Sequence, residues 1–190
     1  MKENVTNADT SLILKLQQGN KDALASLMKI YYDNLYNYGW RFSKDEALIK
    51  DCIQEVFISL WQRRETANSI LSPKYYLLRA IKNKVLKALH KNIRISATTN
   101  VQDEYEFFYE FSVERVIIDK QISDEKTEKL KKTLSLLSKR QKEIIYLKYY
   151  QQLDHAQIAE LMNISRQSVY NLLHEAIHKL RTLWHSEFAH

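Results

Sequence analysis

The stretch IAELMNISRQSVYNLL, residues 158–173, decides how the C-terminal part of the chain folds. Asn163 lies between two helical patterns, and asparagine is the non-glycine residue that best tolerates a positive φ in a turn. Ser165 can cap the helix that follows, and Ala159 is small enough for two helices to approach closely. The stretch therefore predicts two helices that meet at a tight corner.

The second of these helices has an apolar stripe and a polar stripe. The apolar residues recur at helical spacing and are expected to be buried: Val169, Leu172, Leu173, Ala176, Ile177 and Leu180. The polar stripe is suited to base edges, because Arg can pair with guanine, and Asn or Gln with adenine, through two hydrogen bonds. It comprises Gln167, Tyr170, Asn171, His174 and His178, with Arg166 at the helix start. This predicts a helix-turn-helix that reads duplex DNA in the major groove; an ordinary helical hairpin is the alternative.

Composition favours an all-α, soluble and cytoplasmic protein. Only two glycines and one proline occur in 190 residues, although turns and hairpins depend on these residue types. A formal net charge of +6 favours an anionic partner, and a single cysteine suits a reducing compartment. No apolar run approaches the roughly 18–20 residues that span a membrane. The polar start MKENVTNADT lacks the apolar core of a signal peptide.

Charge is distributed unevenly along the chain. Between Glu65 and Asp103 there are seven basic residues and no acidic one, whereas Asp103 to Glu128 contains nine acidic and three basic residues. Beyond Glu128 the chain is basic again. Two basic blocks separated by an acidic segment indicate two modules that each bind an anion. We predict two small helical domains, residues 1–91 and 112–190, joined by a flexible acidic linker at 92–111. For any single charge run, a solvated helix face is the alternative.

Capping signals locate the expected helix starts. A short first helix can be capped by Asp9 or Thr10 and ends near Gly19, and a second covers residues 22–42. The spacing of a capping box then occurs three times and predicts three further helix starts. The pairs are Ser43 with Glu46, Ser138 with Gln141, and Asp154 with Gln157.

The helix expected after Ser43 has two distinct faces. One is a stripe at the spacing of a buried face, formed by Cys52, Ile53, Val56, Phe57 and Leu60. The other carries Asp51, Gln54, Glu55, Ile58, Trp61 and Gln62. Exposed apolar residues rimmed by charge mark a protein interface more often than a solvated surface. This face is therefore predicted to bind a protein, with burial of Trp61 at the helix end as the alternative.

Pro73 suits the first turn of a fourth helix, KYYLLRAIKNKVLKALHK. Its basic face is suited to phosphate groups and comprises Arg79, Asn83, Lys87 and Lys91, flanked by Lys82 and His90. The preceding stretch, QRRETANSILSPKYY, supplies Arg63, Arg64, Asn68 and aromatic residues. Such a mixture can hold an unstacked base, although Tyr76 lies among apolar residues and is expected in the core.

Two long motifs resemble the extracytoplasmic-function group of bacterial RNA polymerase sigma factors, within the sigma-70 family. They are DCIQEVFISLW at 51–61, followed by the basic helix, and the stretch from LSKRQKEIIYLKYY to HEAIHKLR at 137–181. The resemblance extends from Leu12 to Arg181 except for the central linker. It implies two conserved regions, called 2 and 4, and a cytoplasmic factor that directs core polymerase to promoters. Asn163, Ser138 and Gln157 stand where the family commonly has glycine, proline and glutamate.

The resemblance also implies roles for individual positions. Contacts to core polymerase fall on Asp51, Gln54 and Glu55, and we expect Ile58 and Trp61 of the same face to join them. Recognition and melting of the minus-ten promoter element fall on Asn83 and the basic residues near it, Arg79, Lys82 and Lys87; we add Arg63, Arg64 and Asn68 from the preceding stretch. Recognition of the minus-thirty-five element falls on Arg166, Gln167, Tyr170 and Asn171, and we add Ser165 and His174 of the same helix. The acidic linker is expected to enter basic channels of the polymerase, and an anti-sigma factor is a further expected partner.

Two other functional classes fit less of the chain. A stand-alone helix-turn-helix regulator would explain residues 138–181 but would leave the face around Glu55 without a purpose. A nuclease would need a carboxylate cluster, a Cys/His ligand set or a glycine-rich phosphate loop, and none is recognisable. His155, His174 and His178 share one region but suit a polar surface rather than a metal site. We therefore expect no catalysis, no cofactor and no metal.

Overall fold

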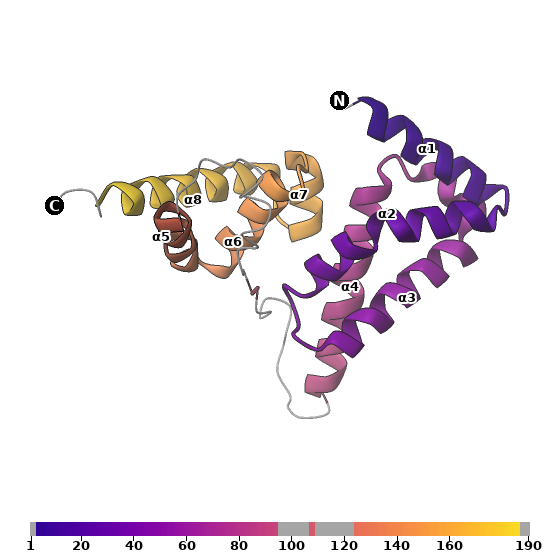
Figure 1. Cartoon of the computed structure of the whole chain (residues 1–190), viewed down its shortest axis with the longest axis horizontal. Coiled ribbons are helices and arrows are strands. Elements are labelled where there is room, and N and C mark those ends of the chain that lie inside the picture. Colours follow the sequence, from indigo (N-terminus) through magenta and orange to yellow (C-terminus); the bar gives the residue numbers. More distant parts are fainter. Residues whose placement is uncertain (1–2, 95–106, 109–123, 187–190) are drawn as a thin grey trace. The chain divides into compact units, whose positions relative to one another are not determined.

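The structure is a computed structural model of the chain, and it describes residues 3–94, 107–108 and 124–186 (Figure 1). Every regular element within these residues is a helix, which confirms the all-α prediction. The chain divides into two compact units, Met1–Glu106 and Phe107–His190, which are described separately below. Most of the acidic segment that was predicted to be a linker lies outside the described residues. Among the helices described, none is long and apolar enough to cross a membrane.

The first unit contains four α-helices and one short 3₁₀ helix. These are α1 (Glu3–Gln17), α2 (Lys21–Gly39), α3 (Glu46–Gln62), η1 (Arg64–Ser69) and α4 (Pro73–Arg94). The α2 helix packs against α1, α3 and α4, and α1 also packs against η1 (Figure 1). The core is filled by large side chains that are almost fully buried, among them Leu16, Leu27, Leu35, Tyr38, Ile49, Ile53, Phe57, Leu60, Leu77, Leu78 and Ile81. The stripe predicted to be buried on α3 is confirmed.

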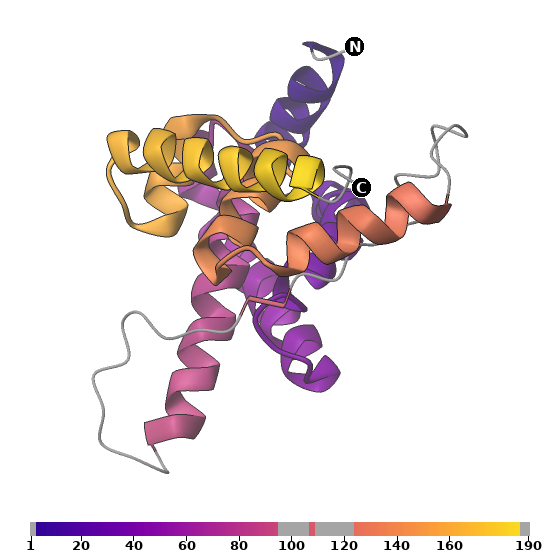
Figure 2. The ribbon, with the colours of Figure 1, turned by 90° about the vertical axis from the view of Figure 1, so that its left-hand side faces the viewer.

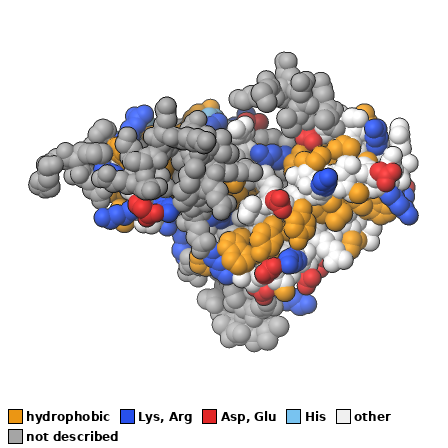
Figure 3. All heavy atoms as spheres, viewed as in Figure 1, with side chains coloured by type: hydrophobic (Ala, Val, Ile, Leu, Met, Phe, Trp, Pro, Cys, Tyr) orange, Lys and Arg blue, Asp and Glu red, His pale blue; other side chains and the backbone are white. Residues whose placement is uncertain are grey.

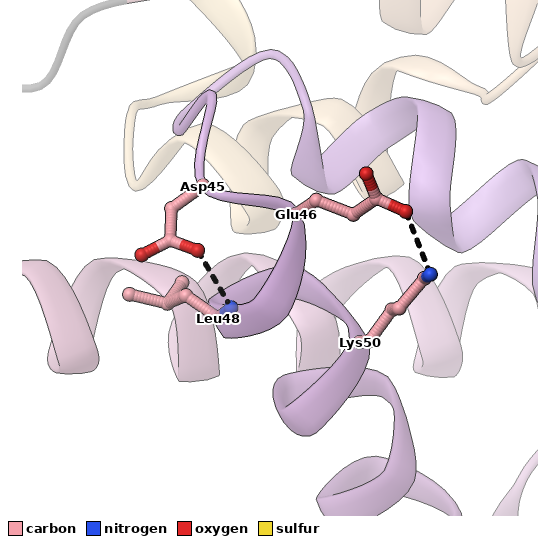
Figure 4. Close-up of polar contacts among 4 residues, drawn as sticks. All are labelled: Asp45, Glu46, Leu48 and Lys50. Carbon is pink, nitrogen blue, oxygen red and sulfur yellow. Dashed lines mark hydrogen bonds and ion pairs between the residues drawn. The ribbon is translucent and has the colours of Figure 1, made fainter.

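Two helix starts predicted in this unit are wrong. The α1 helix begins at Glu3, and Asp9 lies inside it, where its carboxylate accepts a 2.6 Å hydrogen bond from the Tyr31 hydroxyl. Burial, together with this bond, raises the pKa of Tyr31. The α3 helix is capped by Asp45 rather than Ser43, because the Asp45 carboxylate accepts a 3.0 Å bond from the amide of Leu48 (Figure 4). Ser43 instead supports the turn by accepting a bond from the Asp45 amide.

Gly39, the last residue of α2, allows a close approach of helices. A Cβ atom added to Gly39 would lie 3.0 Å from Ile49 Cγ2 and 3.8 Å from Ile81 Cγ1. Ile49 belongs to α3 and Ile81 to α4, and both side chains are fully buried. A larger residue at this point would therefore push α2 away from the two helices that carry the candidate site.

The second unit contains α5 (Asp124–Ser135), α6 (Lys139–Ile145), a π-helical turn η3 (Tyr146–Tyr150), α7 (His155–Met162) and α8 (Arg166–Ser186). The long α8 packs against α5, α6 and α7 (Figure 2). The core of this unit includes Leu134, Leu137, Ile144, Tyr146, Leu147, Ile158, Val169 and Ala176. Phe107, which falls within the predicted linker, is buried against the Tyr146 ring at a centroid distance of 6.0 Å.

Local hydrogen bonds fix the helix ends of this unit. The two predicted capping boxes are confirmed, since Ser138 and Asp154 each exchange side-chain and backbone bonds with the glutamine three residues later. Asn163 adopts a φ of 53°, as predicted for the corner between α7 and α8. Gln152 also has a positive φ, 55°, which the sequence did not indicate. Two left-handed residues therefore bracket α7.

Candidate functional site

The polar face of α8 is presented to solvent as predicted. The predicted DNA-binding residues are all exposed, and so is His178: Ser165, Arg166, Gln167, Tyr170, Asn171 and His174. Ser165 also caps the helix, because its hydroxyl accepts a 3.0 Å bond from the amide of Ser168. On the opposite side Val169, Leu173 and Ala176 are buried, while Leu172, Ile177 and Leu180 are half-buried. The helix therefore has a fixed orientation with one accessible polar stripe.

Side chains on this stripe contact one another and the preceding helix. The Gln167 amide donates a 3.1 Å hydrogen bond to the Asn171 side-chain oxygen, so the two groups are aligned one turn apart. The Tyr170 ring lies 4.3 Å from the His155 ring of α7, with an angle of 51° between the ring planes. Tyr170 nevertheless remains 54% exposed and available to a ligand.

His155 is a functional candidate that the sequence reasoning did not assign. It is the first residue of α7, directly after the Asp154 cap, and it is half-buried. Its sequence position gives no hint of the Tyr170 contact, because the two residues lie on different helices. His174 and His178 face each other at 6.4 Å on α8. Across the described residues no group of three or more His, Cys, Asp or Glu side chains could hold a metal ion.

The outer face of α3 forms a second candidate surface. Asp51, Gln54, Glu55 and Ile58 are exposed on it, with Ile58 at 47%. Trp61 is half-buried. It is therefore neither fully exposed on the predicted interface nor fully buried in the core, which was the alternative. The Arg64 guanidinium lies 4.9 Å from the Trp61 ring and donates a 3.2 Å bond to the Trp61 carbonyl. Arg64 thus links the end of α3 to the start of η1.

An ion pair joins this surface to the basic helix. The Lys84 ammonium lies 2.6 Å from a Glu55 carboxylate oxygen, across 29 residues of sequence. The hydrogen bond from Lys84 and its positive charge lower the pKa of Glu55. The ion pair therefore links the exposed faces of α3 and α4. Because its side chain is 60% exposed, it is also accessible to a partner.

The basic face of α4 contains most, but not all, of the predicted residues. Arg79, Asn83, Lys87 and Lys91 are exposed, and His90 is half-buried. Lys82 differs from the prediction, because it is only 5% exposed and its ammonium lies 5.6 Å from the centre of the Phe42 ring. Lysine can bury its long aliphatic stem against apolar groups in this way. Lys82 is therefore excluded from the exposed basic face.

The segment before α4 is attached to α1 and to the core of the first unit. Arg63 is exposed and Arg64 half-buried, whereas the side chain of Asn68 lies outside the described residues. The Gln17 side chain of α1 donates a 3.2 Å bond to the carbonyl of Glu65. Ala67 is 2% exposed and anchors η1 to the core. The predicted base-binding stretch is thus a short helix attached to α1.

An aromatic stack on α2 was also missed by the sequence reasoning. Tyr32 and Tyr36 have ring centroids 6.5 Å apart, and Tyr36 and Trp40 are 5.9 Å apart, with nearly parallel planes. The Lys44 ammonium lies 4.8 Å from the centre of the Trp40 ring. Hydrophobic side chains form a continuous row on this unit in Figure 3. The i, i+4, i+8 spacing of the three rings in the sequence could have predicted that they stack along one side of a helix.

Comparisons with protein families identify both units. Residues 27–95 match the family described as Sigma-70 region 2, and residues 127–180 match Sigma-70, region 4. The first match begins within α2 and extends through α4, and the second begins within α5 and ends within α8. Together they account for more than half of the chain. A comparison with curated proteins finds no match.

Two solved structures share this fold. One is CnrH in complex with the cytosolic domain of CnrY, with 18% identity, 94% of this chain and 98% of that chain covered, and a TM-score of 0.55. The other is the sigma factor RpoE in complex with the anti-sigma factor NepR from Bartonella quintana. It is 15% identical, covers 83% of this chain and 93% of that chain, and has a TM-score of 0.56. With regions 2 and 4 present in order, the chain belongs to the sigma-70 family of transcription initiation factors.

Proposed function

We propose that this factor belongs to the extracytoplasmic-function group and that three separate surfaces carry its function. The outer face of α3 binds core RNA polymerase, the η1–α4 segment binds the minus-ten element, and α8 reads the minus-thirty-five element. The observation that carries the proposal is the presence of regions 2 and 4 in one short chain, each with an exposed polar or basic surface. Chemistry is left to the polymerase, and this chain needs no catalytic group.

The α3 surface suits a protein partner. It combines the exposed Asp51 and Glu55 carboxylates with the Gln54 amide and the apolar side chain of Ile58. A basic, partly apolar polymerase surface would complement both features. Trp61, held by Arg64, extends the apolar part toward η1. In this proposal, the polymerase contact lies next to the segment that binds the minus-ten element.

The α4 and α8 surfaces suit two different modes of DNA binding. Arg79, Lys87 and Lys91 provide charge for phosphate groups, with the Asn83 amide among them. On α8, Arg166 and the aligned Gln167–Asn171 pair offer bidentate groups for base edges. The acceptor on Asn171 is engaged by Gln167, so the pair presents a defined set of donors and acceptors to the groove.

The two weak DNA contacts gain strength by being tethered to one polymerase. Each surface alone depends on phosphate charge and is expected to bind DNA weakly at physiological salt. Once one element is bound, the second contact becomes intramolecular, with an effective concentration set by the spacing of the two units. Tethering explains why one helix is enough to read duplex DNA. The remaining helices bind the polymerase and the minus-ten element.

The proposal includes two further features of the cellular setting. CnrH is described in complex with the cytosolic domain of CnrY, and RpoE with the anti-sigma factor NepR. By analogy, an anti-sigma factor is a proposed partner of this chain as well. A cytoplasmic location follows from the proposed contacts with polymerase and promoter DNA.

The decisive experiment reverses one charge on the α3 surface. Glu55→Lys is expected to weaken binding to core polymerase at least about tenfold, because an exposed carboxylate that faces a basic surface becomes a repulsive ammonium. Binding is measured by fluorescence anisotropy of labelled factor, followed by transcription from a matched promoter. Glu46→Lys is the matched control, because Glu46 is exposed on the same helix and is also paired, with Lys50 (Figure 4).

A charge swap separates polymerase binding from the internal ion pair. Glu55→Lys combined with Lys84→Glu restores an ion pair of opposite polarity between α3 and α4. If Glu55 contacts polymerase, the double variant remains defective in binding. Full recovery would mean that Glu55 serves only to position α4. Promoter-specific DNA binding without any polymerase would favour a stand-alone regulator and contradict the proposal.

A further inference from the structure

The short helix η1 depends on its neighbours for a defined orientation. A 3₁₀ helix has poorer hydrogen-bond geometry than an α-helix, and runs longer than three or four residues are uncommon. The η1 helix extends over six residues, and among the described side chains none caps its first turn. Its buried residue Ala67 has a small side chain, which offers little surface for packing. Contacts with other elements therefore set the orientation of η1.

The first of these elements is α1, which packs against both η1 and α2. The side-chain amide of Gln17, the last residue of α1, donates a 3.2 Å hydrogen bond to the carbonyl of Glu65 in η1. The α1 helix is itself held in the unit, because Leu16 is fully buried and the Asp9 carboxylate accepts the hydrogen bond from Tyr31 of α2. Gln17 thus attaches η1 to a helix that is part of the core.

The backbone at the end of α1 has a defined geometry. Gly19 adopts a left-handed φ of 81°, and its amide donates a 2.9 Å bond to the carbonyl of Leu16. The amide of Asn20 donates a 3.1 Å bond to the carbonyl of Lys15. These two bonds and the left-handed glycine form a Schellman motif, which ends a helix in one specific way. The direction from which Gln17 reaches Glu65 is therefore fixed.

The second element that holds η1 is the end of α3. The Arg64 guanidinium lies 4.9 Å from the centre of the Trp61 ring and donates a 3.2 Å hydrogen bond to the Trp61 carbonyl. Arginine suits this double role, because its planar group can lie over an aromatic ring while its N–H groups donate hydrogen bonds. Arg64 is half-buried, whereas the adjacent Arg63 is exposed. Of the two arginines, Arg63 is the more accessible to a phosphate group.

We propose that Gln17 and Arg64 are positioning residues that hold η1 on α1 and α3, and that this support determines the base selectivity of the η1–α4 segment. The inference rests on the proposed function of that segment. Groups that recognise a ligand must be held within about 0.5 Å of the productive geometry, and supporting contacts provide this precision. The region 2 match begins at residue 27, so the proposal adds a role for α1, which lies before it.

The first test measures base selectivity on single-stranded DNA, for which no melting is needed. The wild-type factor with core polymerase selects a promoter from a randomised DNA pool. Minus-ten oligonucleotides are then made with the selected sequence and with single base changes. Selectivity is the ratio of their affinities for the complex of factor and polymerase.

Gln17→Met keeps the size of the side chain but loses the hydrogen-bond donor. It is expected to lower the selectivity ratio about threefold to tenfold. Gln17→Lys again supplies a donor and is expected to recover most of the ratio. Gln18→Met is the matched control, because it changes the same residue type at the next position, which is exposed, and should leave the ratio unchanged.

The second test separates a positioning role of Arg64 from a phosphate contact. Loss of one phosphate contact to a single strand reduces the slope of log K against log salt concentration by about 0.7. Arg63→Gln is expected to show this reduction, whereas Arg64→Gln should keep the slope and lower the selectivity ratio. Arg64→Lys should also lower the ratio, because lysine keeps the charge but lacks the planar group of donors.

Three results would overturn the positioning role alone. They are an unchanged selectivity ratio in Gln17→Met, a reduced salt slope in Arg64→Gln, and a loss of polymerase affinity in Gln17→Met as large as its loss of selectivity. The polymerase affinity of Gln17→Met is expected to equal that of wild type. A wild-type complex that shows no base preference in the minus-ten element would overturn the proposed function of the η1–α4 segment together with the positioning role.

Discussion

The two units build their candidate surfaces in different ways. In the second unit, the polar face of α8 follows from bonds within a few residues: the Asp154 cap, the left-handed Asn163 and the Ser165 cap. In the first unit, the surface depends on contacts between residues far apart in sequence, such as Glu55 with Lys84 and Gln17 with Glu65. A local motif can be recognised from sequence, whereas a surface assembled from several helices depends on packing.

The difference also concerns how each surface is oriented. On α8, one helix supplies the polar stripe and its own buried stripe fixes its rotation. In the first unit, α3 and α4 must be held side by side, and this depends on the core beneath them and on the close approach at Gly39. Changes in the core of the first unit should therefore strongly affect the surface formed by α3 and α4 and should affect the polar face of α8 much less.

The largest predicted effect tests whether the two surfaces depend on separate cores. Phe57→Ala removes a ring that is 2% exposed beneath α3, and we expect a loss of about 3–5 kcal/mol in the stability of the first unit. Hydrogen exchange should lose protection in α2, α3 and α4 while α6, α7 and α8 keep theirs. Ile58→Ala, on the exposed side of the same helix, is the control and should change little. Equal loss of protection in both units would show that they share one cooperative core.

The next effect concerns base recognition by the second unit. Arg166→Ala is expected to reduce discrimination at one base pair of the upstream element by about 1–3 kcal/mol, because the proposed bidentate contact to guanine would be lost. Competition with singly substituted promoters, using the complete polymerase, measures this discrimination. Arg181→Ala is the matched control, since Arg181 is exposed at the other end of α8. A uniform loss on all sequences would identify Arg166 as a phosphate contact instead.

Sequence reasoning predicted the second unit better than the first, for physical reasons. Capping boxes at Ser138 and Asp154 and the corner at Asn163 are encoded by residue types with specific backbone roles, and all are confirmed. The left-handed Gln152 was not predictable, because glutamine has no such preference and only the surrounding turn imposes it. The contact between His155 and Tyr170 likewise depends on how α7 crosses α8.

In the first unit, the buried stripe of α3 was predictable from the helical spacing of its apolar residues. Which of two possible side chains caps α3 was not predictable. Ser43 and Asp45 are both good caps, and the structure selects Asp45. The sequence predicts Lys82 to be part of the exposed basic stripe, yet its side chain is buried and its ammonium lies close to the Phe42 ring. The sequence likewise shows that Leu71 is apolar but does not show its exposure, because that depends on where η1 and α4 end.

A moderate effect is expected from the contact between α7 and α8. His155→Ala and Tyr170→Ala should each weaken recognition of the upstream element, and the double variant should lose less than the sum of the two. The coupling free energy is expected to be about 0.5–1.5 kcal/mol, the range for a pair of aromatic rings in contact. The binding free energy of complete polymerase on an upstream-element duplex is measured for each single variant and for the double variant, relative to wild type. His155→Phe keeps a ring beside Tyr170 and should retain most of the binding, whereas strict additivity would remove His155 from a positioning role.

The smallest effect compares the two left-handed residues that bracket α7. Gln152→Gly should stabilise the second unit by up to about 1 kcal/mol, because glycine adopts a φ near 55° without the steric cost borne by other L-residues, offset in part by greater freedom of the unfolded chain. Asn163→Gly should gain less, since asparagine already tolerates this region. Denaturant unfolding of the full chain, followed by signals from the second unit, measures both. Gln152→Ala is the control: it shortens the same exposed side chain without removing the Cβ atom, so a gain equal to that of glycine would rule out backbone strain as the cause.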